Sequence, residues 1–280
     1  MVRPLAGWNH PWPLGRTGAA LGAAALLALA GLAVLCNRET PRLLGLQPAT
    51  KGTASVPPKQ ASWVSPLSRQ CSVRDTALVR RLTALRREMP TRMRTVTIDP
   101  SNYGERKRRD VYGNPVDSTP SLVVLHETVY GIGSAINTFT THHPNDADQV
   151  SYHILIGETG QVIQTLDPSK RAFGAGYSAF KGRWDVTNPS MAGSVNNFAL
   201  HLSLETPLDG EDSEAGHSGY SSRQYDAMAV VLADWLRRYR IPFDHITTHR
   251  HVDLGLERAD PRSFDWAALQ QRLAALGALC

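Results

Sequence analysis

Hydrophobic and polar positions are arranged in three different ways along the chain, and each pattern predicts a different element. Residues 17–35 form an apolar run without a single charge. Residues 121–126, Ser-Leu-Val-Val-Leu-His, form a short β-branched run that is typical of a buried strand. Residues 221–239 place apolar side chains at helical spacing and predict an amphipathic helix, which Ser221 or Ser222 can cap.

Weaker patterns of the same kinds occupy much of the remaining chain. Helices are predicted at residues 72–89, 131–141 and 265–276, and strands at residues 150–156, 161–166 and 200–204. The sequence Glu-Thr-Gly at residues 158–160 separates two of these strands and indicates a hairpin. Because strands and helices alternate, we expect an α/β (α+β) fold with a central mixed β-sheet flanked by helices.

The apolar run at residues 17–35 is long enough to cross a bilayer once, since a spanning helix needs about 20 apolar residues. We favour an uncleaved signal anchor that contacts the membrane through this N-terminal helix. A cleaved signal peptide, cut near the small residues at 28–30, stays open. A lipoprotein anchor at Cys36 is disfavoured because Leu35 is too large for the position before such a cysteine. A buried core helix is disfavoured because the run has no polar face.

Either favoured form of this segment exports the rest of the chain, to the periplasm or the outer face of the cytoplasmic membrane. The predicted organisation is a short tail at residues 1–16, the signal anchor or signal peptide at 17–35, a flexible linker at 36–66 and one domain at 67–280. The linker is predicted from its content of Pro, Ser, Thr, Ala and Lys.

Charge and cysteine content narrow the range of partners. The net charge of +5 favours anionic partners, but we find no zinc-finger, helix-turn-helix or RNA-binding signature and expect no nucleic acid. The basic run at residues 106–109 suits either an anionic wall or membrane surface or a solvated loop, and we favour the loop.

The chain has three cysteines, and no two of them have the CxxC spacing of a thiolate metal site. In an exported domain Cys71 and Cys280 can form a disulfide that joins its ends; two unpaired thiols are the alternative.

Two histidines and one aspartate are the leading candidates for a metal site. His126 ends a hydrophobic strand, His249 follows the long amphipathic helix, and Asp260 comes eleven residues later. A catalytic zinc site uses three protein ligands of these kinds and leaves one position for water. Taken alone, each histidine is more typical of a hydrogen-bonded structural residue.

Five segments occur in the order seen in the zinc amidases of the type 2 amidase and peptidoglycan-recognition superfamily, which the chain resembles over residues 118–268. They lie at residues 122–128, 150–156, 171–176, 202–205 and 248–261. The resemblance implies a sheet-and-helix fold, one zinc ion, and peptidoglycan or muropeptides as the substrate.

The resemblance also implies a role for individual residues. His126 and His249 match the two zinc histidines and Asp260 the carboxylate ligand. His251 is a rival for His249, but the family pattern places the ligand directly before an arginine. Glu205 matches the acidic residue that faces the zinc-bound water in many members, where it can accept a proton.

Three further positions follow from the same resemblance. Arg258 falls where relatives often have lysine, and its charge can stabilise an oxyanion. His153 and Gly176 are candidates for lining the substrate groove, although His153 suits a structural role equally well. The stretch Phe173-Gly174-Ala175-Gly176 departs from the Trp-His-Ala-Gly often found in relatives, so substrate contacts there can differ.

These observations predict a monomeric zinc enzyme that hydrolyses the amide between N-acetylmuramic acid and L-alanine. The main alternative is a peptidoglycan-recognition module that does not cut; members of that kind lose a zinc ligand, whereas all three candidates are present here. Hydrolysis of another amide is a weaker alternative, because the sequence has no HExxH motif.

Overall fold

The computed structural model describes residues 56–212 and 214–280. The chain divides into two compact units, residues 1–47 and 48–280, and the first lies wholly outside the described residues, as do the predicted tail and the apolar run at 17–35. Within the described part, no helix combines the length and the apolar character that a membrane crossing requires.

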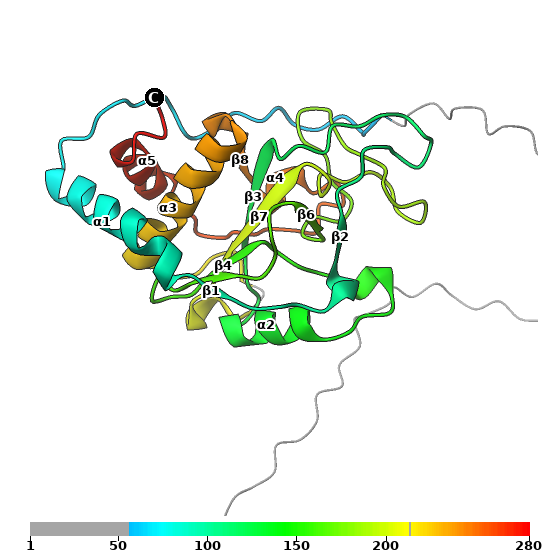
Figure 1. Cartoon of the computed structure of the whole chain (residues 1–280), viewed down its shortest axis with the longest axis horizontal. Coiled ribbons are helices and arrows are strands. Elements are labelled where there is room, and N and C mark those ends of the chain that lie inside the picture. Colours follow the sequence, from blue (N-terminus) through cyan, green and yellow to red (C-terminus); the bar gives the residue numbers. More distant parts are fainter. Residues whose placement is uncertain (1–55, 213) are drawn as a thin grey trace, which may run out of the picture. The chain divides into compact units, whose positions relative to one another are not determined.

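A six-stranded mixed sheet forms the centre of the domain, as predicted (Figure 1). Its order is β1 (Arg94–Thr95), β5 (Val162–Gln164), β4 (Ile154–Ile156), β7 (Ala199–Leu204), β3 (Leu122–Glu127), β8 (Ile246–Thr248). Only the β4–β5 pair, the predicted hairpin, is antiparallel among these neighbours. Gly160 in its turn has φ +80°, a conformation that suits glycine. A separate antiparallel pair joins β2 (Tyr103–Glu105) to β6 (Lys170–Ala172).

Helices cover both faces of the sheet. On one face α1 (Thr76–Arg92), α3 (Ser222–Tyr239) and α5 (Trp266–Ala275) pack together, and α2 (Ile132–Thr140) lies on the other (Figure 1). The short α4 (His249–Val252) follows β8 directly. Single 3₁₀ turns lie at Pro100–Asn102, Asp146–Asp148, Leu208–Gly210 and Phe243–His245.

The ends of the helices follow from their capping residues. The predicted helix at 72–89 begins only after Asp75, whose carboxylate accepts the N–H of Leu78. At the start of α3, Ser221 rather than Ser222 is the cap, because Ser221 and Gln224 form a reciprocal capping box.

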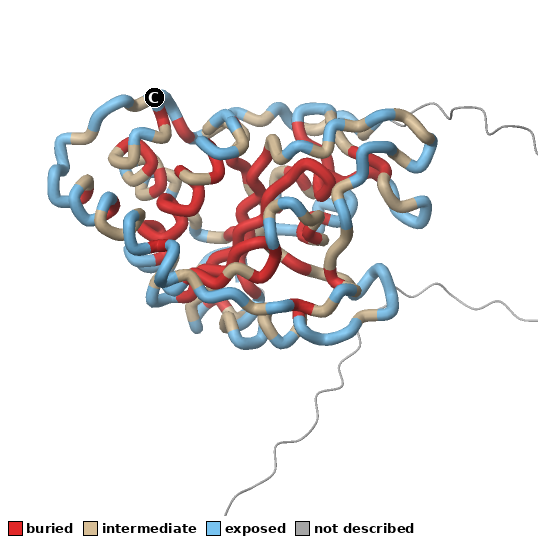
Figure 2. The backbone as a smooth tube through the Cα atoms, viewed as in Figure 1, coloured by how far each residue is buried: buried red, intermediate tan, exposed pale blue. Residues whose placement is uncertain are grey.

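The strands β3 and β7 present different chemistry on their two faces, because successive side chains of a strand point in opposite directions. Val123 and Leu125 of β3 join the leucines of β7 in the core beneath α3. The buried centre of the domain in Figure 2 contains these strands and much of α3. The opposite face of the same two strands carries His126, His201 and Ser203, all buried. Apart from Glu127 at the end of β3, the buried polar side chains of the two strands therefore lie on the face away from α3.

The described end of the predicted linker is attached to the domain. The side-chain amide of Gln60 donates to the carbonyl of Ala179 at 2.9 Å, and Trp63 Nε1 donates to the carbonyl of Asp244 at 2.8 Å. The ring of Trp63 also lies 4.6 Å from that of His251, centroid to centroid. Residues 56–66 thus pack on the domain instead of forming a free linker, because Gln60 and Trp63 both find partners on its surface.

The structure contains a disulfide between Cys71 and Cys280, and not two free thiols. Beside it, the N–H of Gln70 donates to the carbonyl of Leu279 at 3.0 Å. The two ends of the predicted domain are therefore held together both covalently and by hydrogen bonding.

Candidate metal centre

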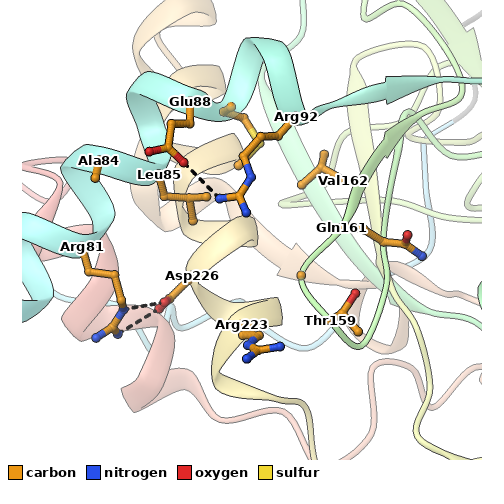
Figure 3. A pocket seen from close by; sticks show the side chains of 12 residues that line it. Arg81, Ala84, Leu85, Glu88, Arg92, Thr159, Gln161, Val162, Arg223 and Asp226 are labelled. Atoms are coloured by element: carbon orange, nitrogen blue, oxygen red, sulfur yellow. Dashed lines mark hydrogen bonds and ion pairs between the residues drawn. The ribbon is translucent and has the colours of Figure 1, made fainter.

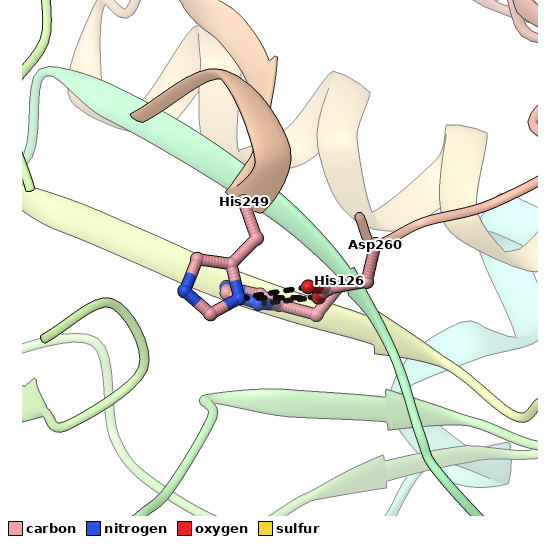
Figure 4. A group of neighbouring side chains, drawn as sticks. All are labelled: His126, His249 and Asp260. Atoms are coloured by element: carbon pink, nitrogen blue, oxygen red, sulfur yellow. Dashed lines mark hydrogen bonds and ion pairs between the residues drawn. The ribbon is translucent and has the colours of Figure 1, made fainter. Parts of the chain in front are cut away.

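Two neighbouring parallel strands bring the predicted ligands together. His126 lies at the carboxyl end of β3, and His249 begins α4 directly after β8, which pairs with β3 in parallel. Carboxyl ends of parallel strands meet at one edge of a sheet, so the two rings converge there. Asp260 comes from the loop that follows α4, and its carboxylate faces both imidazoles (Figure 4).

The distances within this cluster fit a small metal ion. His126 Nδ1 lies 3.3 Å from Asp260 Oδ2, and His249 Nδ1 lies 3.0 Å from Asp260 Oδ1. Ligands of a tetrahedral zinc, each about 2.1 Å from the ion, are about 3.4 Å apart. His126 Nδ1 is buried and makes no hydrogen bond of good geometry, although it faces the carboxylate. The residues present therefore offer the donor set and the spacing that zinc requires.

The surroundings favour the protonation states that bind a metal. Burial lowers the pKa of His126 to about 4, so the ring is neutral at neutral pH. Burial alone would raise the pKa of Asp260, but the neighbouring rings of His126 and His249 outweigh it and hold that pKa below its usual value. Neutral imidazole and ionised carboxylate are the ligand forms of these side chains.

A buried ion pair holds the Asp260 loop against β3. The carboxylate of Glu127, next to His126, accepts the backbone N–H of Arg262 at 2.9 Å and also pairs with its guanidinium. On the other side, the carbonyl of Asp260 accepts the N–H of Arg250 in α4 at 3.0 Å. These contacts fix Asp260 relative to both histidines.

The structure places His249, and not His251, in the cluster. The ring of His251 packs instead against Trp63 and Phe180. Arg258 is exposed on the loop between α4 and Asp260, and its charge adds to the burial that lowers the pKa of His126. The guanidinium of Arg258 is therefore close enough to influence the cluster.

Glu205 has a different set of contacts from those of the three ligands. Its Oε1 accepts the N–H of Ile132 at 2.6 Å and its Oε2 accepts the N–H of Glu158 at 2.8 Å. It thereby joins the start of α2 to the β4–β5 turn. In the β3–β7 register the residue opposite His126 is Ser203, two positions before Glu205. Ser203 Oγ is buried and has no hydrogen-bond partner within the described structure.

His153 and Gly176, the two predicted groove residues, lie in different environments. His153 is fully buried: its Nδ1 accepts the N–H of His201 at 3.0 Å, and its Nε2 lies 3.2 Å from the carbonyl of Lys170. A side chain so enclosed cannot line an open groove, so the structural role is the one observed. Gly176 is exposed, and a side chain there would meet no neighbour within 4 Å.

Comparison with known proteins places the chain in a family. Residues 116–263 match the family described as N-acetylmuramoyl-L-alanine amidase. The chain belongs to this amidase family. The 1,6-anhydro-N-acetylmuramyl-L-alanine amidase AmpD of Escherichia coli K12 is 31% identical over 169 residues, which are 55% of this chain and 82% of AmpD. The same enzyme of Citrobacter freundii is 30% identical over 167 residues, 55% of this chain and 80% of that protein.

A solved structure also aligns with the chain. The crystal structure of a selenomethionine derivative of AmpD covers 64% of this chain and 92% of its own, with 27% identity and a TM-score of 0.48.

Several residues of this amidase centre were not predicted from the sequence. Tyr152 stacks on His126 with 4.3 Å between ring centroids, and His201 Nδ1 lies 2.9 Å from His126 Nε2. The alternation of leucines with Ala199, His201 and Ser203 in β7 is the signal that could have revealed the polar face of this strand.

A hollow of this amidase domain, about 520 Å³, lies between α1, α3 and the β4–β5 turn, against the face of the sheet that α3 covers (Figure 3). Two of its arginines are paired, Arg81 with Asp226 and Arg92 with Glu88. It lies against the sheet face opposite His126 and contains none of the three candidate metal ligands.

Proposed function

We propose that the chain is a zinc-dependent hydrolase of the amide bond between N-acetylmuramic acid and L-alanine in peptidoglycan or muropeptides. The observation that carries this proposal is the convergence of His126, His249 and Asp260 in a chain of the amidase family. The relatives named above act on 1,6-anhydro muropeptides, and this supports a soluble muropeptide as one substrate class.

His126 Nδ1, His249 Nδ1 and one oxygen of Asp260 would hold the zinc. When bound, zinc supplies a Lewis acid and a water of lowered pKa. Arg258, exposed beside the cluster, would bind and orient the substrate carbonyl oxygen and counter the negative charge that develops on it. Glu205 is the proposed proton acceptor, and each of its carboxylate oxygens accepts one backbone N–H and keeps a second lone pair that can take a proton.

Exposed apolar side chains flank the proposed site along the chain. Val129 and Tyr130 follow His126 by three and four residues, and Leu256 precedes Asp260 by four. All three are exposed, Leu256 at 88%. Such side chains on loops beside a metal site would pack against the apolar faces of a sugar ring or a peptide stem, which supports a site open to a bulky substrate.

We also propose that the domain works outside the cytoplasm, in the periplasm or at the outer face of the cytoplasmic membrane, attached through residues 17–35. The Cys71–Cys280 disulfide supports this location, because disulfides persist in oxidising compartments. The apolar run at 17–35 supports membrane attachment by its length and its lack of charge. We propose that the domain is a monomer.

The contacts of Glu205 favour one alternative, a recognition module that binds muropeptides without cutting them. Both carboxylate oxygens accept backbone N–H groups, and Ser203 stands opposite His126 in the register. A carboxylate fixed by these two contacts acts as the proton acceptor only if it lies within hydrogen-bond reach of the reacting water. This alternative keeps the metal site and loses the hydrolysis.

Mass spectrometry of defined muropeptides incubated with the full chain tests the proposal. Hydrolysis should release free peptide and intact sugar, stop when a chelator removes the metal, and return when zinc is added. Zinc and muropeptide binding without any cleavage would establish the recognition module instead. Cleavage that persists in the chelator would remove the proposed role of zinc.

A further inference from the structure

We propose that His201 is a positioning residue that selects the tautomer of His126 and thereby frees His126 Nδ1 to bind zinc. The inference rests on the zinc site proposed above. It concerns a side chain that lies behind the cluster, on β7, and not one of the three ligands.

The two ring nitrogens of His126 have different partners. Nδ1 faces Asp260, whereas Nε2 lies 2.9 Å from Nδ1 of His201. A neutral imidazole carries one ring proton, so Nδ1 can bind a metal only when that proton is on Nε2. His126 Nε2 then donates to His201 Nδ1, which must be the acceptor. Metal-binding histidines usually donate their second N–H in this way, and such partners fix the ring.

The surrounding strands hold the ring of His201 in this position. Its backbone N–H donates to His153 Nδ1 at 3.0 Å, and its carbonyl accepts the N–H of His153 at 2.9 Å. The rings of His201 and His153 lie nearly parallel, with an interplanar angle of 4°. His201 Nε2, which carries the proton in this arrangement, is buried without a hydrogen-bond partner in the described structure. A buried donor without a partner is rare. Here the proton has to be on Nε2 because Nδ1 of the same ring accepts the N–H of His126.

Gly174 provides the space that this arrangement needs. A Cβ atom at position 174 would lie 2.4 Å from His201 Nδ1 and 2.7 Å from its Cγ. Any side chain there would displace the ring that His126 contacts. Glycine at position 174 therefore leaves the space that the ring of His201 occupies.

Two substitutions whose side chains have the same branched shape test the role of His201. In His201→Asn the side-chain oxygen can still accept from His126 Nε2, whereas the side chain in His201→Leu cannot. We expect His201→Leu to weaken zinc binding by the full chain about 10- to 100-fold in competition with a chromogenic chelator, the range for lost outer partners of a ligand. His201→Asn should restore affinity to within about threefold of the wild type, because the acceptor is back in place.

The tautomer itself gives a readout that packing alone would not change. Imidazole ¹⁵N shifts of the zinc-free protein should show His126 protonated at Nε2 in the wild type and in His201→Asn, and a mixture of tautomers in His201→Leu. Wild-type affinity and a single Nε2–H tautomer in His201→Leu would overturn the inference. A wild-type chain that binds no zinc would overturn the proposed function, while the His126 tautomer would still decide the role of His201.

Gly174→Ala gives a second test that does not depend on whether His201→Leu folds. Gly174→Ala should weaken zinc binding because the added Cβ displaces the ring of His201. In a His201→Ala background that ring is absent, so Gly174→Ala should cause no additional loss of zinc affinity. Equal losses in both backgrounds would contradict the proposed route through His201.

Discussion

Glu127 and Arg262 form a buried ion pair that joins the strand carrying His126 to the loop carrying Asp260. Their side chains are 7% and 9% exposed, and Glu127 also accepts from Tyr220 and lies 3.1 Å from His217 Nε2. Glu127 directly follows His126, and Arg262 lies two residues beyond Asp260. The separation of two proposed zinc ligands is therefore set by residues that do not bind the metal.

Removing the carboxylate of this pair should loosen the site and the fold together. Glu127→Ala removes the buried carboxylate that pairs with the guanidinium of Arg262 and leaves the more exposed Asp212 as its charged neighbour, and we expect a loss of about 3–5 kcal/mol in the free energy of unfolding. Urea denaturation measures this, and zinc affinity should fall as well. The matched control is Asp234→Ala, which breaks the exposed Asp234–Arg237 pair and should cost less than about 1 kcal/mol. Equal effects of the two variants would contradict the proposed clamp.

Glu205 can be tested for its two roles separately. Glu205→Gln removes a proton acceptor and replaces one accepting oxygen by a donor, so we expect the hydrolysis rate to fall about 10²- to 10⁴-fold while zinc stays bound. Ile132→Pro removes only the N–H that contacts Oε1, and proline is tolerated at this first position of α2. Its rate should stay near that of the wild type. A Glu205→Gln enzyme with full activity would exclude the proton-acceptor role.

The metal-free protein should lose stability as the pH falls from about 6.5 to about 4. Burial lowers the pKa of His126 to about 4 and of His153 to about 3, and lowers that of His201 well below its usual value. Across this window the unfolded chain binds protons at these histidines while the folded chain does not, so acid favours unfolding. The contribution of Asp260, whose folded pKa is lowered, is lost only at more acidic pH.

Urea-unfolding midpoints of the metal-free protein at pH 7.5 and pH 5 measure this dependence. His153→Asn should make it shallower, because the asparagine oxygen can still accept the N–H of His201 but carries no titrating group. A midpoint that does not change with pH in the wild type would show that these rings take up protons in the folded state.

Loss of the disulfide should destabilise the domain without changing the metal site. Cys71 and Cys280 are 209 residues apart, so the bridge closes a long loop and Cys71→Ser should cost about 2–5 kcal/mol. Thermal unfolding of the variant and of the reduced wild type should show the same loss, with zinc affinity unchanged below the transition. A variant as stable as the oxidised wild type would contradict the stabilising role of the bridge.

Long elements with a clear hydrophobic pattern were predictable from the sequence, because the spacing of their apolar residues along the chain shows which side chains are buried. The strand at 121–126 and the helix at 221–239 correspond to β3 and α3 within one residue. β1 and β8 were not predicted, since two or three residues are too few to show a period and their pairing depends on strands distant in sequence.

Within the site, the three proposed ligands were found because each has a metal-binding side chain at the end of a recognisable element. The basic run at 106–109 shows the limit of such arguments. We favoured a solvated loop, yet the Arg106 guanidinium donates to the carbonyls of Pro168, Asn197 and Ala199, and burial lowers its pKa to about 10. Sequence charge does not reveal carbonyl groups that become available only in the folded chain, and the contacts of His201 were hidden for the same reason.

The disulfide that ties residue 71 to residue 280 also makes the domain a closed covalent ring. A protease that cuts one exposed loop between these positions, such as the one around Leu208, would open the ring without releasing a fragment. Both pieces would stay joined by the bridge and by the sheet, and would separate only after reduction and unfolding. In the proposed location outside the cytoplasm, where a damaged protein cannot be resynthesised in place, the domain would in this way tolerate a first cut.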